Sequence, residues 1–296
     1  MGVKNPFIST QIRASSLMKK GLGVWGVFLF LILILTACTP QPVPPVKRIA
    51  LLAPFEGRYR EIGYDAIYPI RLALKEANSE LVLVTADDGG TLDSAVIQAR
   101  RLADDPTLLV ALVIGSTATQ PEVLAAFGDV PVVVIGAWDT TPSKSVFVLA
   151  SEALASVKTT HTQAIGIAVD TSTPVTGGEI FALKQYPKLR PHLDGVTVAL
   201  SALPADADFA ARLIASDLFV PAPGALSTLA YDAGGLIHTV ITTQSATTRD
   251  AVNIALKAVA FTGLNGRIAF TADGWWEDAP VITYHYADGV LTSLAP

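Results

Sequence analysis

The sequence predicts an α/β fold in which short buried strands alternate with amphipathic helices. Four apolar runs between residues 47 and 135 each end at turn-forming residues, a pattern typical of strands buried on both faces. The segments between these runs carry apolar residues at helical spacing. Because a helix between two strands returns the chain in the same direction, we expect a parallel sheet with right-handed crossovers.

The first half of the folded chain has the clearest pattern. Residues 48–53 form an apolar run that Pro54 stops, and the run at 108–114 is followed by a Gly-Ser-Thr turn. Apolar residues recur every three or four positions in the segments between the runs, as helices require. The predicted strands are 48–53, 81–84, 108–114 and 132–135, and the predicted helices are 61–78, 92–104 and 119–127.

Beyond Ala150 the alternation is weaker, although it continues to the end of the chain. Ala-Asp-Gly turns separate the last apolar runs and favour short strands there. The predicted strands are 164–169, 196–200, 267–270, 281–286 and 290–294, and the predicted helices are 177–186, 206–215, 223–242 and 247–260. The pattern therefore predicts an α/β lobe with a parallel sheet at 47–150, followed by a second α/β region at 151–296.

Composition excludes several classes of protein. The chain has 296 residues and a net charge of -5, and its basic residues do not cluster after the first segment, so no nucleic-acid partner is expected. A single cysteine, Cys38, excludes a disulfide within the chain. The four histidines lie far apart, and hydrolase and nucleotide-binding motifs are absent. We therefore expect no enzyme activity, no metal site and no cofactor.

The first segment has the pattern of an export signal. Residues 21–37 are uncharged and mostly apolar, and they follow Lys19 and Lys20. The segment ends in Leu35-Thr36-Ala37-Cys38, which resembles the bacterial lipobox that marks lipidation and cleavage. This resemblance implies a lipoprotein signal peptide at 1–37 and a lipid on Cys38.

A lipid on Cys38 would hold the folded part outside the membrane. Residues 38–46 are rich in proline, which favours a stiff extended linker between lipid and domain. An uncleaved anchor helix is the alternative, and Met18 is an alternative start of the chain. In each case we expect residues 39–296 to be extracytoplasmic, on the periplasmic side or at the cell surface.

Several motifs occur in the order found in one known family. They are Ala53-Pro54-Phe55-Glu56-Gly57-Arg58-Tyr59, Asp87-Asp88, Val113-Ile114-Gly115, Pro131 before 132–135, Thr140-Thr141-Pro142, Ala230-Tyr231-Asp232-Ala233 and residues 261–270. Together they resemble the type I periplasmic binding proteins, specifically the leucine/branched-chain amino acid receptors of ABC transporters. Each motif is weak alone, but their order makes the resemblance specific.

The resemblance implies two Rossmann-like lobes that are joined by hinge strands and close on a ligand. Residues 47–150 would be the first lobe. Residues 151–296 would form a reduced second lobe, with the hinge and with C-terminal segments that return to the first lobe. The implied function is solute binding: a small polar ligand, such as an amino acid or another small carboxylate, is presented to an ABC permease.

The resemblance also implies a ligand site in the loops after residues 53, 114 and 135. In open α/β sheets, ligands bind outside the carboxyl ends of the strands. In the family, hydroxyls and backbone amides of the last two loops hold the ligand carboxylate. The implied ligand-binding residues are Glu56, Tyr59, Ser116, Thr117, Thr119, Trp138 and Thr140. The alternative for the threonines is that they only cap helices.

The sequence departs from the family pattern in three places. Glu56 stands where relatives carry a small hydroxyl residue, and its carboxylate would repel an anion. Trp138-Asp139 replaces smaller residues before Thr140. The stretch between the first lobe and Tyr231 is too short for a complete second lobe and lacks the family's acidic residue for the ligand amine, for which Glu179 is a candidate substitute.

A second interpretation is a reduced relative that has lost transport and acts as a surface sensor or interaction module. Glu56 and the short second lobe favour it. Two further features also have alternatives. Asp87-Asp88 at a strand end is read more simply as a turn than as a metal pair. Trp275-Trp276 is read more simply as packing than as a ligand-stacking surface.

Overall fold

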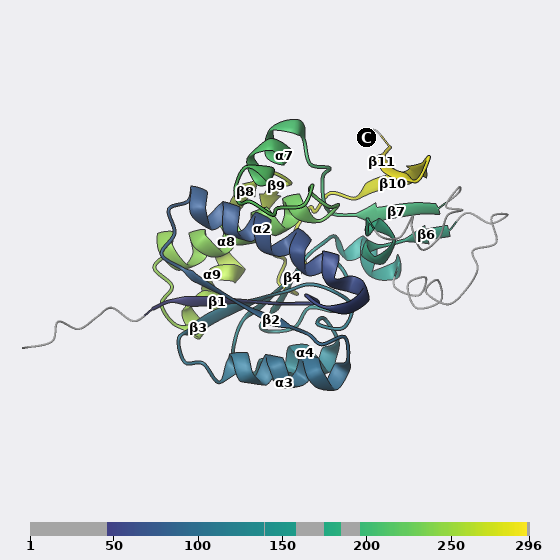
Figure 1. The fold of residues 1–296 in the computed structure, drawn as a ribbon. Helices are drawn as coiled ribbons and strands as arrows, with labels where there is room; N and C mark the ends of the chain where they lie inside the picture. Colours follow the sequence, from purple (N-terminus) through teal and green to yellow (C-terminus); the bar gives the residue numbers. More distant parts are fainter. Residues whose placement is uncertain (1–45, 139, 158–174, 185–195, 295–296) are drawn as a thin grey trace, which may run out of the picture. The chain divides into compact units, whose positions relative to one another are not determined.

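A parallel sheet of five strands organises the folded chain (Figure 1). The computed structural model describes residues 46–138, 140–157, 175–184 and 196–294. The expected signal peptide, Cys38 and the strand expected at 164–169 lie outside these residues. The sheet order is β2-β1-β3-β4-β5, with every pairing parallel. The strands are β1 Arg48–Ala53, β2 Val82–Asp87, β3 Leu108–Val113, β4 Val132–Ile135 and β5 Val146–Leu149.

The parallel pairing of the strands confirms the α/β class and the predicted sheet. The expectation of burial on both faces is wrong for β2, whose residues are all exposed or partly exposed at the edge of the sheet. Every residue of β3, β4 and β5 is buried, as in sheets covered on both faces. β5 escaped prediction because no helix separates its short apolar run from β4. Beside it, the Val148 N–H donates to Gly274 O at 2.9 Å, and the Trp276 N–H donates to Val148 O at 3.1 Å.

This edge pairing explains the tryptophan pair. The side chains of Trp275 and Trp276 are buried, and the Trp276 Nε1–H donates to Arg267 O at 2.8 Å. Packing, and not an exposed stacking surface, is therefore their role in the described structure.

Helices cover both faces of the sheet (Figure 1). α3 (Leu92–Ala103) and α4 (Pro121–Ala126) lie against one face, and α2 (Arg60–Glu76) lies against the other together with α8 (Ser227–His238). α9 (Arg249–Ala258) packs on β3. The last turn of α8 continues as a π-helical turn, η4 (Thr239–Thr243). The predicted helices at 223–242 and 247–260 are confirmed, with the first beginning later than expected.

Small residues let α2 and α8 pack closely. A Cβ added to Gly234 of α8 would lie 3.1 Å from both the Cβ of Ala73 and the carbonyl oxygen of Ile70 on α2. A larger side chain at this position would push the two helices apart. Segments that are distant in the sequence therefore enclose the same face of the parallel sheet.

A second, mixed sheet has the order β11-β10-β7-β6. β6 and β7 are parallel, and the other pairs are antiparallel. Its strands are β6 Val175–Gly177, β7 Val196–Leu200, β10 Ile282–Ala287 and β11 Val290–Ser293. The remaining elements are the short helices η1 Gly57–Tyr59, η2 Glu152–Val157 and η3 Glu179–Ala182, the helix α7 Ala207–Ile214, and the hairpin strands β8 Phe261–Gly263 and β9 Gly266–Ile268.

The helix expected at 177–186 is wrong over its described part. Gly177 ends β6, and the chain makes only the short 3-10 helix η3 before Lys184. Two consecutive glycines, Gly177 and Gly178, explain the break, because glycine in a helix interior costs conformational entropy.

A buried carboxylate, that of Asp232, ties α8 to the β8–β9 turn. Asp232 Oδ1 accepts the Leu264 N–H at 2.7 Å, and Oδ2 accepts the Asn265 N–H at 2.8 Å and the Asn265 Nδ2–H at 2.7 Å. Asn265 Oδ1 in turn accepts the Leu203 N–H at 2.6 Å. Three segments are therefore held through one carboxylate that has no exposed surface.

We predict that Asp232→Ala lowers the free energy of unfolding by about 3 kcal/mol or more, because three donors, two of them buried, lose a charged acceptor. Urea unfolding followed by circular dichroism measures this change. Glu277→Ala is the matched control, since its half-exposed carboxylate bonds only Arg267 among the contacts described and should cost less than about 1 kcal/mol. Equal effects of the two substitutions would contradict the role given to Asp232.

Candidate functional site

The loops after β1, β2 and β3 meet at one edge of the parallel sheet, because parallel strands present their carboxyl ends on the same side. They enclose a cavity of about 430 Å³. Its lining residues are Pro54, Glu56, Gly57, Arg58, Tyr59, Ile62, Asp87, Asp88, Gly89, Gly90, Ser116 and Thr117. A cavity at this edge lies where ligands bind in open α/β sheets.

Asp87 holds the first of these loops against the second. Its Oδ1 accepts the backbone N–H of Phe55 at 2.6 Å and that of Glu56 at 3.1 Å. Its Oδ2 accepts the Gly89 N–H at 3.1 Å. The carboxylate of β2 therefore fixes where the β1 loop begins and how Glu56 enters the cavity wall.

The turn after β2 needs glycine. Gly89 and Gly90 have φ values of +68° and +67°, in the left-handed region that residues with a side chain seldom adopt. Asp88 is buried, and its Oδ1 accepts the Gly90 N–H at 2.8 Å. Burial raises the pKa of the Asp88 carboxyl above its ordinary value, although the Gly90 N–H opposes the rise.

The aspartate pair therefore builds a turn, as the simpler interpretation of the sequence expected. Both carboxylates are engaged by backbone N–H groups. Within residues 46–138, 140–157, 175–184 and 196–294, no three His, Cys, Asp or Glu side chains gather in a way that would hold a metal ion.

Four of the predicted site residues come together at this cavity. Glu56 and Ser116 are exposed, and Tyr59 and Thr117 are half-buried. Arg58, for which the sequence pattern implied no role, adds an exposed guanidinium. These residues therefore offer a carboxylate, a cation and three hydroxyls, a set that can pair with both charges of a small zwitterion.

The other three predicted residues do not line the cavity. Thr119 and Thr140 are buried. The Thr119 hydroxyl donates to Gly115 O at 2.8 Å and lies 3.2 Å from Trp138 O, and the Thr140 hydroxyl lies 3.4 Å from Thr119 O. These bonds link the loop after β3 to the loop after β4. In the described structure both hydroxyls donate to backbone carbonyls. They do not cap a helix as the alternative expected, because α4 begins after Gln120 without a side-chain cap and Thr140 lies in a loop.

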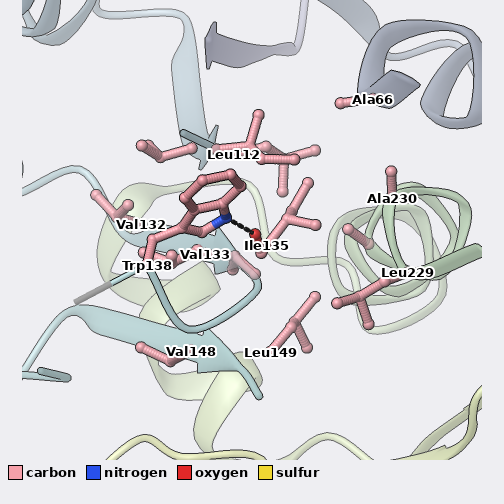
Figure 2. Close-up of a cluster of buried hydrophobic side chains, with 14 of the residues drawn as sticks. Ala66, Leu112, Val132, Val133, Ile135, Trp138, Val148, Leu149, Leu229 and Ala230 are labelled. Atoms are coloured by element: carbon pink, nitrogen blue, oxygen red, sulfur yellow. Dashed lines mark hydrogen bonds between the residues drawn. The ribbon is translucent and has the colours of Figure 1, made fainter. Parts of the chain in front are cut away.

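Trp138 fills the interior instead of shaping an open pocket. Figure 2 shows its ring among buried aliphatic side chains of β3, β4 and β5, with Nε1–H donating to Ile135 O at 2.6 Å. Its φ of +43° is unusual for a residue with a side chain, and it turns the chain sharply after β4. A ligand contact by Trp138, Thr119 or Thr140 would require these buried groups to become accessible.

The sequence did not single out Arg58, Asp88 and the two glycines as parts of the cavity wall. The available signal was Asp87-Asp88-Gly89-Gly90 directly after a predicted strand, since such a turn places its residues at the carboxyl edge of the sheet. The sequence of this turn does not show which strands lie next to each other in the sheet, and the strand order decides which loops share a cavity.

A second group of charges lies on α2 beside the segment that follows β6. Asp65 Oδ1 accepts Lys184 Nζ–H at 2.7 Å, and the same Nζ donates to Ala222 O. Burial raises the pKa of Asp65 from 3.8 to about 6, against the lowering effect of Lys184 and with a further rise from Glu61. The ion pair thus joins α2 to residues that are far along the chain.

Asp65 predicts a pH-dependent stability. Because its pKa is raised in the folded state, its protonated form is favoured by folding, and this contribution is lost as the pH rises from 3.8 to about 6. In urea unfolding, we expect Asp65→Asn to gain roughly 3 kcal/mol relative to the wild type between pH 4 and pH 7. Asp208→Asn is the matched control, since it makes the same substitution at an exposed carboxylate, and the pH dependence of Asp65→Asn is compared with it. A pH-independent difference for Asp65→Asn would contradict the raised pKa.

A scan of the sequence against protein-family models found no match, and no curated protein sequence matched significantly. Solved structures do match. An extracellular ligand binding receptor from Desulfohalobium retbaense DSM5692 is similar at TM-score 0.67 and 16% identity, over 84% of this chain and 59% of that one. The chain thus spans about three fifths of that receptor's length.

Two further structures are similar over 84% to 85% of this chain. A leucine binding protein from Thermotoga maritima MSB8 has a TM-score of 0.63 and 14% identity, with 98% of its own length covered. The branched-chain amino acid transporter substrate binding protein from Streptococcus pneumoniae, in complex with isoleucine, has a TM-score of 0.61 and 13% identity, with 100% covered. This chain therefore has the fold of the type I periplasmic binding proteins.

Proposed function

We propose that this protein is an extracytoplasmic solute-binding lipoprotein of an ABC transporter, which binds a small polar ligand such as an amino acid and presents it to the permease. The observation that carries the proposal is the cavity at the carboxyl ends of β1, β2 and β3. The fold supports it, because the similar proteins are named as ligand receptors and transporter binding proteins.

The chemistry of the cavity wall favours a zwitterion. Glu56 suits an ammonium group, and Arg58 with the hydroxyls of Ser116 and Thr117 suits a carboxylate. Asp87 and Asp88 add no free acceptor of comparable strength, because backbone N–H groups already bond them. Glu56 stands where relatives carry a small hydroxyl residue, and in this proposal it supplies, from the first lobe, the acidic residue that binds the ligand amine.

The proposal includes the division of the chain. Residues 1–37 serve as signal peptide, 38–46 as linker, 47–150 as first lobe and 151–296 as a reduced second lobe with the hinge. Lobe closure by hinge motion would enclose the ligand without any bond being made or broken. Within the part of the chain that the structure describes, none of the helices has the length and hydrophobicity needed to span a membrane.

A ligand screen tests the proposal. Isothermal titration and thermal shift with L-leucine, L-isoleucine, other amino acids and small carboxylates should give at least one saturable ligand. Free ligand at about 100 times its dissociation constant should stabilise the protein by about 2.7 kcal/mol. Absence of any shift across the panel would remove the solute-binding proposal.

Arg58→Met should weaken such a ligand about tenfold or more, because a charge-assisted hydrogen bond to its carboxylate is lost. The melting temperature without ligand should stay the same, since Arg58 is exposed. Arg60→Met is the matched control: Arg60 is also exposed, but it lines a different hollow along α2. Equal affinity of wild type and Arg58→Met would take this guanidinium out of the site.

Lipid attachment has its own test in cells fed with radioactive palmitate. We expect the wild-type protein to carry the label and to lack residues 1–37, whereas Cys38→Ser should be unlabelled and keep them. Thr39→Ser, one residue later, should behave as the wild type. An unlabelled wild-type protein that retains residues 1–37 would favour the uncleaved anchor instead.

A further inference from the structure

The carboxyl end of β4 holds a carboxylate that comes from the protein itself. The backbone N–H of Ala137 donates to Glu179 Oε1 at 2.6 Å, across 42 residues of sequence. The Glu179 side chain is only 1% exposed. Ala137 lies in the loop after β4, at the same edge of the sheet as the open cavity, so this N–H is placed where a ligand acceptor would be expected.

The backbone beside Ala137 is shaped to admit this carboxylate. Gly136 has a φ of +93°, and a Cβ added there would lie 3.1 Å from both Cγ and Oε1 of Glu179 and 2.9 Å from Trp138 Nε1. Any side chain at this position would therefore press on the Glu179 side chain. The close approach needs glycine, and the sequence supplies it.

Glu179 begins a buried segment that is anchored at both ends. We call residues 179–184 the strap. Its middle residues, 180–183, are all buried. At its far end Lys184 donates to Asp65 of α2 and to Ala222 O. The strap therefore joins the loop after β4 to α2, and both contacts are polar.

Almost no space remains beneath the strap. The void that Glu179 lines there, together with Ile114, Ala182 and Leu226, measures about 10 Å³, the room of about one water molecule. The cavity along β1, β2 and β3 is open by comparison, at about 430 Å³. The carboxyl edge of the parallel sheet is therefore open at the loops after β1, β2 and β3, and it is filled by protein side chains near the loop after β4.

A carboxylate in this position bears a cost. Burial disfavours a charged group unless hydrogen bonds replace its water, and the bond from Ala137 does so in part. The same bond satisfies an N–H that would otherwise be buried without an acceptor. The Glu179 carboxylate and the Ala137 N–H therefore satisfy each other's hydrogen bonding, as a bound carboxylate ligand and a backbone donor of its site would.

We propose that the strap is an internal occupant of the crevice after β4, in which Glu179 takes the place of a carboxylate ligand at Ala137 N–H. A solute reaches this part of the sheet edge only when the strap withdraws. The inference rests on the proposed function only for the identity of the competing solute. The occupancy itself concerns groups within this chain.

Removal of the side chain tests the occupancy without knowledge of the solute. Glu179→Ala deletes a CH₂–COO⁻ unit, which acetate matches in size and charge. Acetate should stabilise this variant saturably in a thermal-shift titration, with sodium chloride at equal ionic strength as reference. Hydrogen exchange of the Ala137 amide should be about tenfold faster in the variant and slow again when acetate is added. Wild type should not respond, because its site is filled.

Glu122→Ala is the matched control, since it removes an exposed carboxylate from α4 of the same lobe. It should show no acetate response. An equal acetate effect in all three proteins, or an unchanged Ala137 exchange rate in Glu179→Ala, would overturn the proposal. If Glu179→Ala does not fold, Glu179→Gln replaces it, because glutamine keeps the shape of the side chain and is a weaker acceptor. In that case an Ala137 amide that exchanges in Glu179→Gln at the same rate as in the wild type would overturn the proposal.

Titration with L-leucine and L-isoleucine separates this proposal from the solute-binding one. Tighter binding to Glu179→Ala than to wild type supports both. Acetate rescue without binding of any solute from the panel would keep the occupancy and remove solute binding. Solute binding that is equal in both proteins, without acetate rescue, would keep solute binding and remove the occupancy.

Discussion

Parallel pairing of strands that are buried on both faces is the constraint on which the rest of this structure depends. β3, β4 and β5 have no exposed residue, so each must lie between helices on the two sides of the sheet. Parallel order then places every loop that follows a strand at one edge. The open cavity, the buried threonines and the Glu179 contact all lie along that edge because of this one arrangement.

Carboxylates that accept backbone N–H groups fix the loops within this frame. Asp87 holds the start of the β1 loop, Asp232 holds the β8–β9 turn, and Glu179 holds the loop after β4. In each case a charged acceptor joins segments that are distant in the sequence. Such groups are costly to bury unless they are bonded, so the same contacts that satisfy them also make each loop conformation specific.

The two sides of the sheet edge differ in what they leave open. Toward β2 the turn at Asp87–Gly90 contains two glycines, which have no side chains to fill the space. Polar side chains of both charges line a cavity there. Toward β4 the same edge is filled by Trp138 and by the strap, and the hydroxyls of Thr119 and Thr140 bond to carbonyls. A ligand that used the whole edge would therefore compete with the protein's own groups on one side.

The sequence by itself determined the features that depend on neighbours along the chain. Apolar runs and helical spacing predicted four strands of the parallel sheet and the helices around it. The resemblance of short motifs to a known family implied that Glu56, Tyr59, Ser116 and Thr117 belong to one site. The tertiary structure alone decided that β5 joins the sheet and that Thr119, Trp138 and Thr140 lie inside it. It also decided that Glu179 reaches Ala137. These outcomes depend on contacts between residues far apart in the chain, and local periodicity carries no information about such contacts.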